Sequence, residues 1–355
     1  MPARQATLRA HAPPRALGLR ALSREQLDAF LRVAQCAVVA ETHAAFDAYV
    51  LSESSLFLFP TKLVIKTCGT TALLAALPCA LRLAASVGAQ LRRVRYTRAC
   101  FQFPHHQPAP HRSWAEECAF LDGALQTRGQ ARVMGAEGGL RWHVYCAALG
   151  PAPAGAEATV TLEICMWQLD ARAASRFVFG AASALPSARS VTEASGIGAL
   201  FPADTLVDDF LFSPCGYSMN GLLGASLASI HVTPEQRCSY ASLEVSGRAA
   251  DLPCPQQLLR RTAQVFGPGA LSVALTVDGA RGVPREWAAA ALPDGFVRTA
   301  ATRAELPGGG FVHHLAGAAL EGRQGKSAMR VLAAGGRSVL GASLELERTA
   351  ATEVA

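Results

Sequence analysis

The chain has 355 residues, of which 50% are hydrophobic and 17% charged, so it can bury a large core as one large or two small domains. Its formal net charge is +6, but residues 1–24 hold five arginines and no acid, which leaves about +1 for the rest. The composition therefore offers no basic face for nucleic acid. The most apolar run, residues 71–89, contains Pro78 and Arg82, so we expect no membrane span.

Residues 1–20 form a basic leader, rich in Arg and Ala, that is typical of an organelle transit peptide. The whole chain prefers Arg to Lys, however, and this bias alone explains the leader. The ten cysteines contain no Cys-x-x-Cys pair, and no apolar signal-peptide core is present. We therefore expect reduced thiols and a cytoplasmic protein, with the transit peptide as the alternative.

Capping and proline signals predict helices, and apolar runs rich in β-branched residues predict strands. Helices are expected at residues 23–32, at 71–89 with Thr70 or Thr71 as the cap, from Ser113 onward, and at 255–266. Strands are expected at residues 36–42, 61–67, 96–103, 141–147, 159–166, 205–212, 227–233, 238–245, 270–277 and 310–316. The last 30 residues receive no assignment.

These elements do not alternate as βαβα, which favours an α+β fold with antiparallel sheets and helices outside. Residues 149–157 are the segment most typical of a linker. A Pro/His loop contains His105, His106 and His111 without a carboxylate or thiol at ligand spacing, so we predict no metal site.

A Glu-Ser-Ser step stands between two apolar runs within residues 49–57, and read alone it is typical of a turn between strands. The step is Leu51-Ser52-Glu53-Ser54-Ser55, and Lys-Thr-Cys-Gly-Thr-Thr follows at residues 66–71. Together these stretches closely resemble the cleavage region of the eukaryotic S-adenosylmethionine decarboxylase proenzymes.

A second block, residues 212–221, reads Phe-Ser-Pro-Cys-Gly-Tyr-Ser-Met-Asn-Gly and is followed by Ile-His-Val-Thr-Pro-Glu at 230–235. Taken alone, residues 216–220 resemble a nucleophile elbow, but the final glycine of that motif is absent, so this signal is weak. A single histidine in an apolar run is usually a hydrogen-bonded core residue. Both blocks match the same family in order and spacing, which strengthens the resemblance.

The resemblance implies self-cleavage between Glu53 and Ser54. Ser54 would become a pyruvoyl group that forms a Schiff base with S-adenosylmethionine and accepts electrons as CO2 leaves. This reaction would supply spermidine and spermine biosynthesis. The fold implied is a four-layer α/β/β/α sandwich with two central antiparallel sheets and duplicated half-domains that divide near residues 150–157, within one domain that spans residues 21–355.

The resemblance also assigns roles to other residues. His231 would remove the Cα proton of the ester intermediate, Ser218 would hold the oxyanion, and Cys68 would protonate the product. Glu235 would accept the ribose hydroxyls, and Phe212 would stack on adenine.

Two departures from the family pattern are visible. The family's first strand, Phe-Glu-Gly-x-Glu-Lys, has no match in residues 1–24, so we expect a sandwich that lacks a strand, and loose substrate binding. The family's putrescine run Asp-x-Thr-x-Glu here begins with Thr159, which leaves Glu163 and Glu244 and predicts little response to putrescine.

Two functions from different classes remain open at this stage. The first is an active decarboxylase, favoured by Ser54, Ser218 and His231 occurring together. The second is a catalytically weak or inactive partner subunit of an active paralogue, favoured by the unmatched first strand. A homodimer or a heterodimer with a paralogue is compatible with either.

Overall fold

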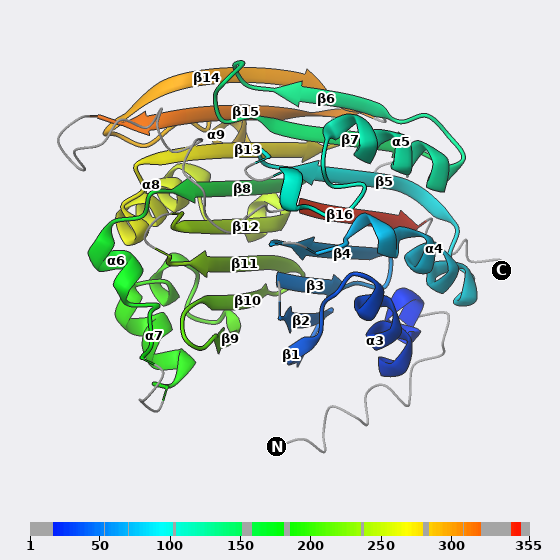
Figure 1. The fold of residues 1–355 in the computed structure, drawn as a ribbon, viewed down its shortest axis with the longest axis horizontal. Coiled ribbons are helices and arrows are strands. Elements are labelled where there is room, and N and C mark those ends of the chain that lie inside the picture. The colour runs from blue at the N-terminus through cyan, green and yellow to red at the C-terminus, as the bar shows by residue number, and fades with distance from the viewer. Residues whose placement is uncertain are drawn as a thin grey trace.

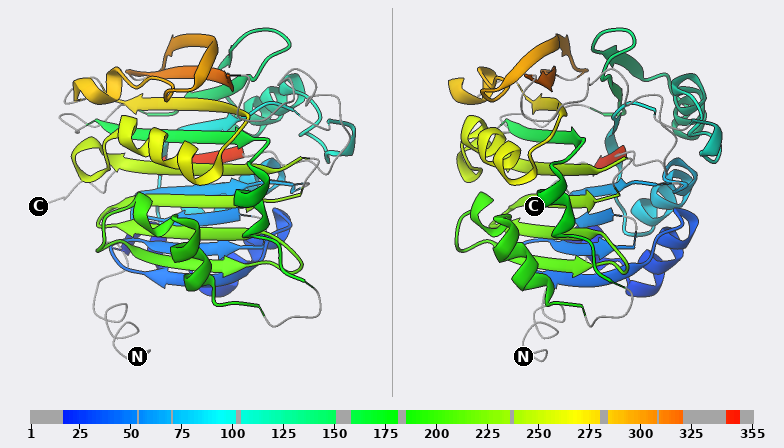
Figure 2. Two further views of the ribbon diagram at one scale, coloured as in Figure 1. Left: turned by 90° about the vertical axis from the view of Figure 1, so that its left-hand side faces the viewer. Right: turned by 60° about the vertical axis from the view of Figure 1, so that its left-hand side comes forward.

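The computed structural model describes residues 17–52, 54–69, 71–101, 104–150, 158–180, 185–235, 238–279, 284–307, 309–320 and 342–348. In these residues the chain forms two eight-stranded sheets whose strand pairs are all antiparallel. Figure 2 shows the sheets face to face with helices on both outer sides. The predicted α+β sandwich of four layers is confirmed.

The first sheet carries the N-terminal strands and one strand from the C-terminal end (Figure 1). Its spatial order is β1 (Val38–His43), β2 (Asp47–Leu51), β3 (Ser54–Leu58), β4 (Lys62–Thr67), β16 (Ala342–Arg348), β5 (Leu91–Arg98), β7 (Trp142–Ala148) and β6 (Gln130–Met134). The helices on this half are η1 (Gly18–Ala21), α3 (Arg24–Val33), η2 (Leu74–Ala76), α4 (Leu77–Ser86), η3 (Pro104–His106) and α5 (Trp114–Leu125).

The second sheet follows the segment predicted as a linker, of which residues 151–157 lie outside the described residues. Its order is β14 (Phe296–Glu305), β15 (Gly310–Ala319), β13 (Ala270–Asp278), β8 (Thr159–Trp167), β12 (Tyr240–Arg248), β11 (Ser226–Thr233), β10 (Tyr217–Leu223) and β9 (Leu206–Leu211). Its helices are α6 (Ala171–Ser175), α7 (Ala188–Ser195), η4 (Gly198–Leu200), η5 (Ala249–Asp251), α8 (Pro255–Phe266) and α9 (Arg285–Ala288).

Local signals fix several helix starts as predicted. Ser23 caps α3 and forms a capping box with Gln26, which satisfies two backbone N–H groups. Ser113 caps α5 by accepting from the backbone N–H of Glu116 at 3.2 Å. Helix α8 has proline in its first turn, where a missing N–H costs nothing.

The predicted helix at residues 71–89 begins later than expected. Helix α4 starts at Leu77 with Pro78 in its first turn, because proline is tolerated there but not further into a helix. Thr71 does not cap it, since its hydroxyl donates to the carbonyl of Cys68 at 3.2 Å. Thr70 lies outside the described residues.

Several elements were missed or misplaced. Strand β5 covers residues 91–98 and not 96–103. Its first half was missed because the alternate residues that it buries are arginines, which sequence patterns treat as exposed. Residues 216–220, interpreted as a possible elbow, lie mostly in strand β10. Elements that also lack a prediction include β6, β14, β16, α6, α7 and α9.

Side chains alternate between the outer helix layers and the layer between the sheets, as strand geometry requires. In β11, Ile230 and Val232 pack toward the helices of the second half, while Leu227 packs between the sheets against Phe57 of the first. Each sheet is therefore apolar on its helix side, and its inner face mixes apolar and polar residues.

Strand β16 lies inside the first sheet, between β4 and β5. Leu344 pairs in register with Ile65 on one side and Tyr96 on the other. Among the described strands β16 fills the sheet between β4 and β5, so no unpaired inner edge is exposed there. The lack of the family's first strand stays a prediction. The Ala/Gly-rich sequence that precedes β16 concealed this strand.

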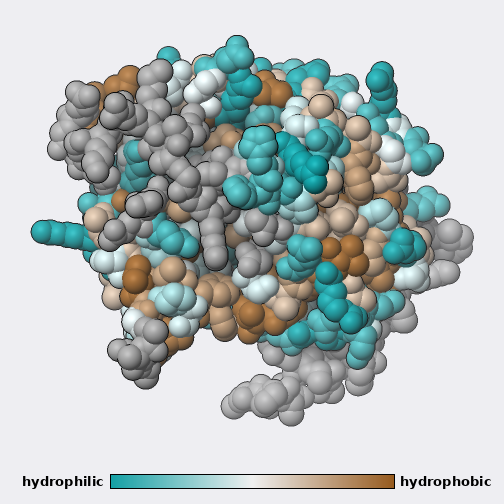
Figure 3. Space-filling model, in the orientation of Figure 1, coloured by the Kyte–Doolittle hydropathy of each residue, from teal (hydrophilic) through white to brown (hydrophobic). Residues whose placement is uncertain are grey.

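Hydrophobic and hydrophilic residues are interspersed over the face shown in Figure 3. The large hydrophobic side chains that are exposed among the described residues come from separate elements: Val33, Val133, Val178, Leu185, Leu206, Val297 and Leu320. None of the helices in the described ranges is both long and apolar enough to cross a membrane.

The packing of β16 predicts a large effect of Leu346→Ala. Leu346 is 2% exposed and packs in the core under α3 and α4. Truncating such a leucine typically costs about 2–5 kcal/mol of the free energy of unfolding. The matched control is Leu320→Ala, since Leu320 is 56% exposed and surface changes usually stay within about 0.5 kcal/mol. Equal urea midpoints for the two variants would contradict this placement of β16.

Candidate active site

A polar patch interrupts the apolar layer between the two sheets. On one side lie Phe46, Phe57 and Leu222, and on the other Trp142 and Tyr240. We call the buried polar residues between them the polar centre: Ser54, Ser55, Lys66, Glu163, Ser218, Asn220, His231 and Glu244. Because both sheets contribute to it, the polar centre exists only when they pack together.

His231 connects the two sheets at the polar centre. Its Nδ1 lies 2.8 Å from Ser218 Oγ on the neighbouring strand of the same sheet. Its Nε2 faces the other sheet, 3.0 Å from Ser55 Oγ and 3.4 Å from Ser54 Oγ. The imidazole therefore stands between the hydroxyl expected to stabilise an oxyanion and the serine expected to be converted.

Two consecutive serines reach the same ring nitrogen, although successive strand residues normally point to opposite faces. Ser54 has a φ of 156°, a value that residues with a side chain rarely adopt. This local distortion lies at the residue after the expected cleavage bond. Its neighbour Glu53 lies outside the described residues.

Burial, and secondly the positive charge of Lys66, lowers the pKa of His231 to about 3. The ring is consequently neutral at physiological pH, and one of its two nitrogens carries a lone pair. A neutral imidazole is the form that can accept a proton.

Lys66 bridges the sheets beside His231. Its Nζ donates to Glu244 Oε2 at 2.9 Å and lies 3.9 Å from Glu163 Oε1. Burial acts to lower the pKa of Lys66, but the two carboxylates outweigh it, so the pKa is raised and the ammonium stays charged. Glu163 and Glu244 are direct cross-strand neighbours, and the lysine offsets the repulsion between them.

A second buried ion cluster lies farther along the same layer. Arg93 donates to Asp278 at 2.6 Å, Arg95 donates to the other oxygen of that carboxylate, and Arg95 also reaches Thr161 Oγ1 at 3.3 Å. Lys66, Arg93 and Arg95 thus equal in number the three acids of these two clusters, which are Glu163, Glu244 and Asp278. Within these two clusters the positive and negative charges balance, so neither cluster holds surplus negative charge for a diamine.

Cys68 follows β4 directly. Its neighbour Thr67 pairs in register with Ser54, and Cys68 packs against the inter-sheet cluster that contains Tyr240. Cys68, the predicted proton donor, therefore lies one residue after Thr67, which pairs with Ser54 across the two strands.

Phe212 and Glu235 lie at the end of the second sheet where β10 begins and β11 ends. Phe212 donates its N–H to the carbonyl of Gly216 at 3.0 Å, and its ring meets Phe210 with centroids 4.9 Å apart. Glu235 is exposed. The pKa of the Cys215 thiol is raised mainly by burial and secondly by the negative charge of the nearby Glu235. Both candidate substrate residues therefore lie nearer the surface than His231.

Sequence reasoning missed Ser55, Asn220 and Lys66 as members of this site. Asn220 is two residues from Ser218, and this strand spacing places both on one face. His111 lies in the loop before α5, as predicted, but it is buried there, with Nδ1 2.7 Å from Glu117 Oε1. No group of metal-binding side chains occurs in the described part of the chain.

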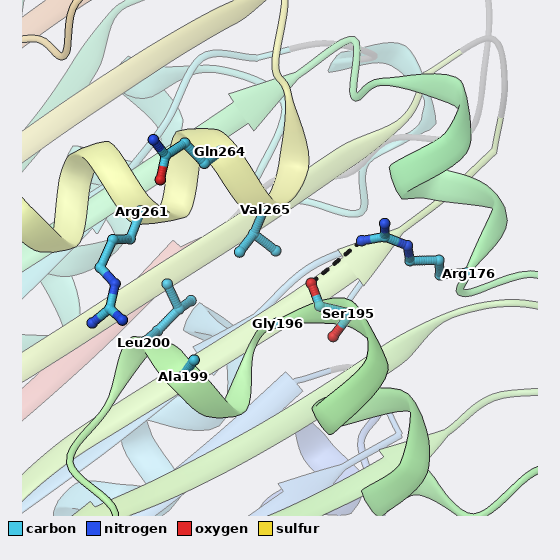
Figure 4. A pocket seen from close by; sticks show the side chains of 8 residues that line it. All are labelled: Arg176, Ser195, Gly196, Ala199, Leu200, Arg261, Gln264 and Val265. Atoms are coloured by element: carbon cyan, nitrogen blue, oxygen red, sulfur yellow. Dashed lines mark hydrogen bonds between the residues drawn. The ribbon is translucent and has the colours of Figure 1, made fainter.

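Two surface hollows lie away from the polar centre. One, of about 270 Å³, is lined by residues of α8 and by Arg176, Ser195, Gly196, Ala199 and Leu200 (Figure 4). The other, of about 370 Å³, shares Arg176, Gln264 and Val265. Both open on the outer helix layer and contain no residue of the polar centre, so we assign neither to the chemistry.

The charge balance predicts how Lys66→Met behaves. Losing the ammonium leaves Glu163 and Glu244 buried without their shared cation, which typically costs about 3–5 kcal/mol. We expect the melting temperature of this variant to rise on addition of putrescine, while that of the unchanged chain stays constant. Lys66→Arg, which keeps the charge, is the control. An equal rise for the unchanged chain would show that a diamine site persists.

The lowered pKa predicts that His231 does not titrate between pH 8 and 5. In a Ser54→Ala chain the imidazole C2 proton shift should stay constant over this range, while in the urea-unfolded chain it should move near pH 6.5. Below pH 6.5 the His231 side chain binds a proton in the unfolded state but not in the folded state. The free energy of unfolding therefore decreases as the pH falls from 6.5 toward 3. A folded-state midpoint near 6.5 would contradict the assignment.

Comparison with known proteins identifies the family. The family model described as adenosylmethionine decarboxylase matches residues 3–314, which includes much of the leader that we set apart. The chain is 44% identical over 308 residues to the S-adenosylmethionine decarboxylase proenzyme of Oryza sativa subsp. japonica, covering 85% of this chain and 76% of the relative. It is also 44% identical over 306 residues to the proenzyme of Zea mays, covering 84% and 75%.

The fold is similar to a solved structure. The crystal structure of a Trypanosoma brucei AdoMetDC monomer superposes with a TM-score of 0.58 at 21% identity, covering 75% of this chain and 99% of that one. From the match over most of its length and its identity to the plant proenzymes, the chain belongs to the adenosylmethionine decarboxylase family.

Proposed function

We propose that this chain is a self-processing S-adenosylmethionine decarboxylase. The observation that carries the proposal is the position of His231, neutral and buried, with Ser218 at one ring nitrogen and Ser54 and Ser55 at the other. Membership of the family supports it. No comparison supports the alternative of an inactive partner subunit.

Processing would use residues of the polar centre in two steps. In the first, Ser54 Oγ bonds to the carbonyl carbon of Glu53 as the peptide C–N bond breaks, which converts the amide to an ester. Ser218 donates a hydrogen bond to the oxyanion that forms on the way. The φ of Ser54 indicates that the uncut chain already holds this residue out of regular strand geometry.

In the second step, His231 Nε2 takes the Cα proton of residue 54, and the carboxylate of Glu53 leaves with the ester oxygen, which gives a dehydroalanine. Water then adds to this residue and its nitrogen departs as ammonia, which would leave the pyruvoyl group. The residues present fit a pyruvoyl group at position 54, because Ser54 is buried beside a neutral base and next to the strand that leads to Cys68. When formed, the group supplies an electron sink for decarboxylation of an amino acid.

Substrate binding would involve the more exposed end of the site. Glu235 would accept the ribose hydroxyls, and Phe212 would present a ring to adenine, with stacking typically worth about 1–3 kcal/mol. Cys68 would return a proton to the product carbon after CO2 departs. The product would serve as the aminopropyl donor for spermidine and spermine.

Intact-mass measurement tests the proposal. We expect the purified protein to separate into residues 1–53 and residues 54–355, the latter with a blocked N-terminus. Ser54→Ala should stay uncut because no hydroxyl is left to attack. His231→Ala should stop at the ester, which hydroxylamine cleaves. A single uncut species of 37.2 kDa after long incubation would overturn the proposal.

A further inference from the structure

Four buried side chains form a continuous hydrogen-bonded chain through the polar centre. It runs from Ser218 to His231 (2.8 Å), to Ser55 (3.0 Å) and to Asn220, whose Oδ1 accepts from Ser55 Oγ at 2.6 Å. All four are at most 6% exposed, and Asn220 is fully buried. Water therefore does not exchange protons with the chain freely, and its internal donors and acceptors must match.

Proton counting leaves two consistent arrangements. A serine hydroxyl has one proton, and a neutral imidazole has one N–H. With Ser55 donating to Asn220, Ser55 Oγ must accept from His231 Nε2–H, and the bare Nδ1 accepts from Ser218. This is the first arrangement, and in it Nε2 carries a proton.

Rotating the Asn220 amide by 180° reverses the direction of every hydrogen bond in the chain. Asn220 Nδ2–H then donates to Ser55, Ser55 donates to Nε2, and Nδ1–H donates to Ser218. In the structure Nδ2 is buried without a hydrogen-bond partner, so the amide holds an unused donor next to Ser55. Both orientations fill the same space and leave one amide atom unsatisfied, so neither is strongly preferred.

We propose that Asn220, acting through Ser55, decides which nitrogen of His231 carries the proton and is thereby a positioning residue for self-processing. The inference rests on the proposed function. Only Nε2 faces Ser54, so the base needed there exists only in the second arrangement. In the first arrangement His231 presents an N–H to Ser54 and the chain remains uncut.

The variant that isolates this role is Asn220→Asp. A carboxylate has the same shape but only accepts, so it keeps Ser55 as its donor and Nε2 protonated. We expect cleavage to slow by at least about tenfold, since a wrong histidine tautomer can cost up to about 10⁴-fold in rate. Asn220→Ala frees Ser55 to donate to Nε2 and should slow cleavage much less.

Two comparisons separate this role from a structural one. Ser229→Ala is the matched control: Ser229 pairs in register with Asn220, is equally buried, and its hydroxyl has no partner in the described structure. It should leave the rate unchanged. In a Ser55→Ala background the link is cut, so adding Asn220→Asp should have little further effect.

Imidazole ¹⁵N shifts of His231 in the Ser54→Ala chain report the tautomer without any cleavage. Asn220→Asp should give the Nε2–H form, and Asn220→Ala should shift the population toward Nδ1–H. Identical tautomers, or equal cleavage rates for the two variants, would overturn the inference. If the unchanged chain does not cleave, the proposed function fails, while the ¹⁵N shifts still decide the role of Asn220.

Discussion

The structure depends on one constraint: polar side chains buried between two sheets must find partners across the layer. A buried polar group without a hydrogen bond, or a buried charge without its counter-charge, is costly. His231 from the second sheet therefore meets Ser54 and Ser55 of the first, and Lys66 of the first meets Glu244 of the second. These contacts hold the sheets in one alignment, and the same contacts assemble the site.

The electrostatics of this layer serve stability and chemistry together. Lys66 offsets the repulsion between two neighbouring carboxylates, and its charge also helps to keep His231 neutral. A histidine held neutral by its surroundings has one bare nitrogen, and which one is bare depends on its hydrogen-bond partners. The hydroxyls of Ser55 and Ser218 are those partners, which makes proton placement a property of the whole chain of contacts.

Much of the fold was predictable where local chemistry acts alone. The capping box of Ser23 and the first-turn proline of α8 fixed helix starts without tertiary help. Prediction failed where burial decides. Strand β5 buries Arg93 and Arg95 because Asp278 of the other sheet pairs with both, and no local pattern reveals that partner. Strand β16 is stabilised by pairing with β4 and β5 on both sides, which its sequence does not show.

For the site, the sequence by itself determined the residue types: the Glu53-Ser54 step, the block with Cys68, and the block with Ser218 and His231 that indicates the family. Only the tertiary structure decided which of them meet. Ser54 and His231 are 177 positions apart, and their contact follows from the packing of the two sheets. Asn220 and Lys66 were missed for the same reason, because a residue's role in a buried layer depends on what the opposite sheet presents to it.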